Sequence, residues 1–135
     1  MKKIEMEEIE ALERMLMTKK YVIKQDPLYF QYLQEQDDIR YGEYLSSKMD
    51  GMDRTKDVIN QFVKDAEPYI KDYTTCFVLI ETLEDSGILM EELQSFKNIA
   101  EKLNNEVILM WSYAISTGIA PRQCKMTVVL SKKSY

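Results

Sequence analysis

The chain has 135 residues, of which 45% are apolar, and its 18 basic and 23 acidic side chains give a net charge of −5. This size suits one domain with one core, and the acidic balance disfavours a nucleic-acid partner, because binding to a phosphate backbone depends on dense Lys and Arg side chains. No run approaches the roughly 20 apolar residues of a membrane helix, and the N-terminus turns acidic where a secretory signal would turn apolar, so we expect a cytoplasmic protein that binds no membrane.

The N-terminal quarter is predicted to be mostly helical. Apolar residues recur at three- and four-residue spacing over residues 3–20, which predicts a first helix, and a short extended piece follows at 21–23. Asp26 and Pro27 are typical of the N-cap and first turn of a second helix. Polar residues take this second helix to its end near Asp38.

Strands and helices alternate in the rest of the chain. Residues 39–46 place apolar and polar side chains on opposite sides, which predicts a strand. The clearest amphipathic pattern predicts a helix over 53–66. The continuous apolar run within 74–82 then suits an inner strand that is covered on both faces.

The C-terminal part is predicted to contain a helix and two strands. An apolar stripe predicts a helix over 89–103, and a fully apolar run predicts a strand over 107–115. The loop 116–123 is short enough for a hairpin, which would pair this strand with the last one, 124–131.

This order of elements predicts an α/β (α+β) fold. We expect a layered sandwich with two or three layers around a four-stranded mixed sheet, parallel across the helical crossovers and antiparallel at the last strand pair. Residues 1–20 are predicted to form an N-terminal helix that either docks on the domain or extends as an assembly arm. Residues 21–135 are predicted to form a single α/β domain.

Cysteine and histidine usage limits the chemistry. The chain has no histidine, and its two cysteines, Cys76 and Cys124, lie inside apolar strand patterns. Reduced, buried thiols are therefore favoured over a disulfide or a nucleophile. Without histidine, no Ser-His or Cys-His pair can form, so we expect no catalytic residue, no metal site and no cofactor.

Residues 76–131 resemble the C-terminal domain of the FtsZ and tubulin superfamily. The segments that carry the resemblance are CFVLIET, GILMEELQSFKNIA, ILMWSYAIS and CKMTVVLS. Lys125, Thr127 and Val128 match the Arg-x-Thr-Val signature of the family in conservative form, and Thr82 matches the threonine of its Thr-Gly-Gly loop. Further back, Arg54 falls in register with the strand, turn and helix of the family. The resemblance implies the fold of that domain.

The nucleotide-binding half of those proteins has no counterpart here. The chain has four glycines, none adjacent to another, and a backbone cradle around a triphosphate needs clustered glycines. We therefore expect neither GTP binding nor GTPase activity. Asp26 is similar to an acidic residue with which FtsZ completes the GTPase site of a neighbouring subunit, but a helix cap explains this residue equally well.

An aromatic cluster is the first candidate site. Such residues bring large, rigid contact area to a protein interface, although an ordinary cover over a sheet is the more common role of such residues. The interface candidates are Asp26, Tyr29, Phe30, Tyr32, Tyr41 and Tyr44.

An acidic cluster at the end of the second predicted strand, 74–82, is the second candidate. Glu81, Glu84 and Asp85 lie where an open α/β sheet commonly binds a ligand, and Arg122 is predicted to lie nearby. A solvated acidic turn is the competing interpretation.

These observations lead to two main hypotheses of function. The leading one is a non-catalytic protein-interaction domain of the FtsZ/tubulin C-terminal type, which self-associates as a homo-oligomer or binds a filament-forming, cytoskeletal partner. The alternative is a small metabolite-binding or enzymatic α/β domain that converged on the same layering. A third hypothesis is a remnant, or one half of a split protein whose GTPase domain is encoded elsewhere.

Overall fold

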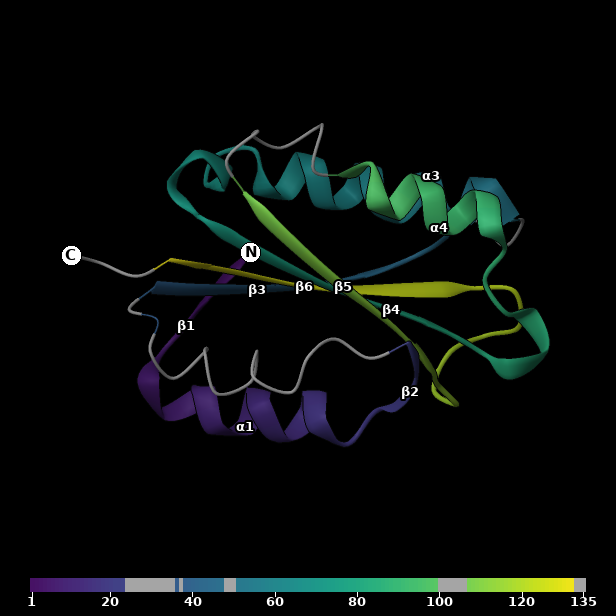
Figure 1. Ribbon diagram of the computed structural model, residues 1–135, viewed down its shortest axis with the longest axis horizontal. Coiled ribbons are helices and arrows are strands. Elements are labelled where there is room, and N and C mark those ends of the chain that lie inside the picture. Colours follow the sequence, from purple (N-terminus) through teal and green to yellow (C-terminus); the bar gives the residue numbers. More distant parts are fainter. Residues whose placement is uncertain (24–35, 37, 48–50, 100–106, 133–135) are drawn as a thin grey trace.

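The computed structural model arranges the chain in three layers (Figure 1). It describes residues 1–23, 36, 38–47, 51–99 and 107–132. Helices α3 (Gly51–Ala66) and α4 (Met90–Lys97) cover one face of a central sheet, and α1 (Met6–Met17) covers the opposite face. Most of the predicted second helix, which begins at Asp26, lies outside the described residues. Its predicted end near Asp38 is wrong, because Asp38 is the first residue of strand β3 (Asp38–Leu45). Within the described ranges, no helix combines the length and apolar character needed to cross a membrane.

The described residues form a sheet of six strands, so the prediction of four strands is wrong. The strand order is β1-β3-β6-β4-β5-β2. The four predicted strands are all present, and two short strands extend the sheet at its edges. The strands are β1 (Lys2–Ile4), β2 (Lys20–Ile23), β3 (Asp38–Leu45), β4 (Thr75–Thr82), β5 (Ile108–Ile115) and β6 (Cys124–Lys132).

Both additional strands are too short to show the alternation of apolar and polar residues that predicts a strand. Strand β1 has three residues and lies where a helix start is predicted, and it pairs antiparallel with β3 through Lys2 and Tyr41. The helix instead begins at Met6, after Glu5, whose backbone N–H donates to the Glu8 carboxylate. Strand β2 has four residues and pairs antiparallel with β5.

The predicted hairpin of the last two strands is also wrong, because β4 lies between β5 and β6. Val78 of β4 is opposite Trp111 of β5 in a parallel pair and opposite Val128 of β6 in an antiparallel pair. Strand β6 pairs antiparallel with both β3 and β4, and most of its side chains are buried. Its place between β3 and β4 therefore covers both of its backbone edges. The predicted parallel pairing across the α4 crossover is confirmed for β4 and β5.

The two faces of β4 belong to two hydrophobic clusters. All eight residues of β4 are buried, as the continuous apolar run predicted. Val78 and Ile80 pack in the cluster under α3 and α4, whereas Phe77 and Leu79 pack in the cluster under α1. Leu16 of α1 is fully buried in that second cluster, so the N-terminal helix packs on the sheet.

Both cysteines are free and buried. Burial raises the pKa of Cys76 to about 12 and the pKa of Cys124 to about 11. Both groups are therefore protonated thiols near neutral pH, and a protonated thiol is a poor nucleophile.

Candidate functional site

An open groove lies where β4 ends. Its volume is about 500 Å³. It is bounded by the segment between α1 and β2, by the 3-10 helix η2 (Glu84–Ser86) and by the residues after β5. Its lining residues are Thr18, Lys19, Lys20, Glu81, Leu83, Glu84, Asp85, Ile115, Ser116 and Thr117.

Glu81 is the buried charge of this groove. It is the seventh residue of β4 and points to the same side of the sheet as Phe77 and Leu79, because side chains alternate along a strand. Only 1% of its surface is exposed. The ammonium group of Lys19 lies 3.2 Å from Glu81 Oε2, which partly compensates the buried carboxylate.

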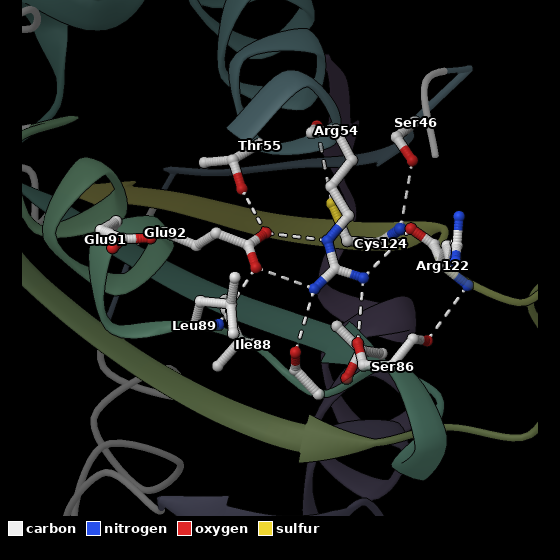
Figure 2. Close-up of polar contacts among 12 residues, drawn as sticks. Ser46, Arg54, Thr55, Ser86, Ile88, Leu89, Glu91, Glu92, Arg122 and Cys124 are labelled. Carbon is white, nitrogen blue, oxygen red and sulfur yellow. Dashed lines mark hydrogen bonds and ion pairs between the residues drawn. The ribbon is translucent and has the colours of Figure 1, made fainter. Parts of the chain in front are cut away.

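Sequence reasoning did not identify a second polar centre, which lies on the opposite side of the sheet and is shown in Figure 2. Arg54 of α3 and Glu92 of α4 form a two-point ion pair, with Nε to Oε2 at 2.8 Å and Nη2 to Oε1 at 2.9 Å. Arg54 Nη1 also donates to the carbonyl groups of Ser86 and Arg122, each at 3.0 Å, and Nη2 donates to the Gly87 carbonyl at 3.2 Å. All five guanidinium N–H groups therefore have an acceptor.

This network fixes the loops at one end of the sheet. Glu92 is fully buried and also accepts hydrogen bonds from Thr55 Oγ1 at 2.6 Å and from the Leu89 backbone N–H at 3.0 Å. Since Arg54 holds η2 and the loop before β6 together, α3 positions the segment that leads from the groove into α4.

Two solved FtsZ structures have a similar arrangement of sheet and helices. An empty FtsZ dimer from M. jannaschii matches with a TM-score of 0.65 and 16% identity, over 87% of this chain and 34% of the FtsZ chain. A tryptophan-to-tyrosine mutant of FtsZ from the same organism matches with a TM-score of 0.66 and 15% identity, over 87% of this chain and 35% of that one. The fold is FtsZ-like.

The similarity to FtsZ concerns the fold. The chain spans about a third of the length of the FtsZ structures it matches, which agrees with the resemblance to the C-terminal domain inferred from the sequence. No protein-family model matches the sequence, and no curated protein matches it either.

The FtsZ-like sheet brings three of the four acidic-cluster candidates together. Glu81, Glu84 and Asp85 line the same groove, whereas Arg122 does not. Arg122 instead donates its backbone N–H to Ser86 Oγ at 3.1 Å. In the described parts of the chain, no group of three His, Cys, Asp or Glu side chains is placed to hold a metal ion.

The aromatic candidates are only partly covered by the structure. Tyr41 is half-buried against α1, and its hydroxyl contacts Glu43 and the sulfur of Met15. Tyr44 is buried on the other face, where its ring packs edge-on against Phe62. The other four candidates, Asp26, Tyr29, Phe30 and Tyr32, lie outside the described residues.

Two carboxylates, those of the buried Glu92 and the exposed Asp65, have lowered pKa values. Burial alone would raise the pKa of Glu92, but hydrogen bonds from Arg54, Thr55 and Leu89 hold it below its ordinary value of 4.5. The hydrogen bond from the Tyr44 hydroxyl lowers the pKa of Asp65 below its ordinary value of 3.8. Both groups are therefore more easily ionised in the folded chain than in the unfolded one.

The free energy of unfolding is expected to decrease as the pH falls below about 4.5. A lowered pKa in the folded state contributes stability that is complete above the unfolded pKa, 4.5 for Glu92, and is lost as the pH falls through the folded value. Urea unfolding at several pH values between about 7 and 3 measures this slope. The variant Glu92→Gln should show a shallower slope, and an unchanged slope would contradict the assignment.

Two large apolar side chains are exposed beside the Arg54 network. Leu89 is 54% exposed and Met90 is 80% exposed, and both lie at the start of α4. The Leu89 N–H is held by Glu92, and Arg54 binds the carbonyl of Gly87 two residues earlier. This pair of residues, which we call the α4 apolar pair, therefore lies on a segment whose backbone is fixed.

Proposed function

We propose that the chain is a non-catalytic protein-interaction domain that associates with itself or with a filament-forming partner of the FtsZ/tubulin type. The observation that carries the proposal is the α4 apolar pair on a backbone held by Arg54 and Glu92. Exposed apolar side chains lose little conformational freedom on binding when the backbone beneath them is already ordered. The FtsZ-like fold supports a filament protein, or a second copy of the chain, as the partner.

The sequence supports the non-catalytic part of the proposal. The four glycines are separated along the chain and cannot form a glycine-rich phosphate loop. The alternative function, binding or conversion of a metabolite, predicts a closed pocket, whereas the groove at the end of β4 is open.

Sedimentation tests this proposal directly. Sedimentation velocity over a range of protein concentrations measures self-association. Co-pelleting with the FtsZ-like filament protein of the same organism, with GTP and with GDP, measures filament binding. Concentration-independent monomers together with no change in polymer mass, length or co-pelleting would refute the proposal.

The variant Met90→Glu is expected to weaken this association by about tenfold or more, equivalent to ~1.4 kcal/mol. The change places a charge in the α4 apolar pair, where binding would have to desolvate it. Met90 is the first residue of α4, where a carboxylate is compatible with the helix. The change should therefore leave the fold intact.

The matched control is Met6→Glu. Met6 is also the first residue of its helix and is 86% exposed, but α1 lies on the opposite face of the sheet. Equal loss of association in both variants would show that the α4 apolar pair is not the contact surface.

A further inference from the structure

Among the described residues, one oxygen of the Glu81 carboxylate has no donor. Oε2 pairs with Lys19, whereas the buried Oε1 has no hydrogen-bond partner in this part of the chain. A buried carboxylate oxygen without a donor costs free energy that a bound N–H group would recover. Because only 1% of the Glu81 surface is exposed and Glu81 lines the groove, this oxygen marks a place for a ligand donor.

The charges of the groove specify a cationic donor. The described residues of its lining include three carboxylates and two ammonium groups, those of Lys19 and Lys20. Glu84 and Asp85 are exposed at its rim, so an entering group meets a negative mouth before it reaches Glu81. A hard metal cation prefers a shell of six or more oxygen ligands, whereas here an ammonium group already lies at one oxygen of Glu81.

We propose that this groove binds a lysine or arginine side chain of the protein partner, with Glu81 Oε1 as the buried acceptor. The inference rests on the proposed function. Lys19 covers Glu81 and retains 22% side-chain exposure, so its flexible side chain can move aside for the entering cation. The rim helix η2 ends three residues before Leu89, so the groove and the α4 apolar pair belong to one continuous segment at one end of the sheet.

Titration of the ¹⁵N-labelled full chain with n-butylammonium chloride tests the chemistry without the partner. We expect saturable shifts of the Lys19, Glu81 and Ser116 amide signals. Tetramethylammonium chloride at equal ionic strength carries the same charge without an N–H donor and should produce no such shifts. Shifts that are absent with butylammonium, or equal with both salts, would overturn the proposal.

Single substitutions in the groove test whether Glu81 is the acceptor of the bound ammonium group. Glu81→Gln should weaken butylammonium binding by about tenfold, whereas Glu84→Gln at the exposed rim should weaken it by less than about threefold, because exposed charges are screened. Lys19→Met removes the competing ammonium group and should strengthen binding severalfold, so this variant keeps the test decisive if Glu81→Gln fails to fold. Weaker binding to Lys19→Met would contradict the assigned role of Lys19.

A capped lysine peptide and its norleucine counterpart then identify the source of the cation. Competition by the lysine peptide alone supports a protein side chain, whereas exclusion of the peptide while butylammonium binds would show that the groove accepts only small amines and would overturn the assigned source. Sedimentation tests the proposed function separately. If the chain associates but binds no ammonium group, only this inference is refuted. If it binds an ammonium group but never associates, the proposed function is refuted.

Discussion

Replacement of Arg54 by methionine is expected to lower the free energy of unfolding by about 3–5 kcal/mol. The change leaves Glu92 as a fully buried carboxylate without its cation and removes the donors from three backbone carbonyls. An ion pair of this kind is costly to break, because the remaining charge keeps its desolvation penalty. Urea unfolding followed by circular dichroism measures the loss.

The matched control is Arg14→Met. Arg14 pairs with Glu10 at 2.8 Å on the exposed side of α1, where both side chains are largely in solvent. Exposed pairs contribute little because water and salt screen them. A loss for Arg54→Met that does not exceed the loss for Arg14→Met would refute the role given to the network.

A double variant separates the buried charge from the lost packing. Arg54→Met combined with Glu92→Leu leaves no unpaired charge and should be more stable than Arg54→Met alone. Because Arg54→Met removes the contacts to Ser86 and Gly87, the double variant should still release the loop before α4. Greater hydrogen exchange than in the wild type at Ile88, whose N–H donates to the Tyr113 hydroxyl and not to Glu92, would show this release.

The sequence indicates that Arg54 and Glu92 are buried, although the apolar stripes used to predict the helices do not include them. Arg54 lies on the same helical stripe as Val58 and Phe62, at spacings of four and eight residues, and Glu92 lies four residues before the buried Phe96. A charged residue on an apolar stripe is buried with it. Its partner cannot be predicted in this way, because Arg54 and Glu92 are 38 residues apart and meet only when α3 and α4 pack together.

The three acidic residues of the groove were easier to group from the sequence than Arg54 and Glu92, because they lie close together in it. Glu81 follows the buried side chains of Phe77 and Leu79 at two-residue spacing, which placed a carboxylate at the end of an inner strand. Lys19 comes from a segment 62 residues away, and only the packing of α1 on the sheet brings it to Glu81.

The order of the strands was the least predictable part of the fold. The α-helices and strands described within residues 51–99 and 107–132 were predicted correctly in type, because the periodicity that identifies each of them is local. Pairing depends on contacts between distant segments, and nothing local in 124–131 distinguishes a strand beside β5 from one between β3 and β4.

Replacement of Phe77 by alanine is expected to lower the free energy of unfolding by about 3–5 kcal/mol. Phe77 is fully buried at the centre of the sheet and belongs to the cluster that Leu12 and Leu16 of α1 complete. The removed ring leaves a cavity between the sheet and α1. This space can close only if α1 moves toward the sheet, and α1 is held by strands β1 and β2 on either side of it.

Urea unfolding measures the total loss of unfolding free energy, and hydrogen exchange shows which helix is destabilised. We expect the amides of α1 to lose more protection than those of α3, because α3 packs in the other cluster, around Phe62. Ile108→Ala on β5 is the control: its side chain is 63% exposed, so the change should stay within about 0.5 kcal/mol of the wild type. A small loss for Phe77→Ala, or equal exchange in both helices, would mean that α1 is not held to the sheet through this cluster.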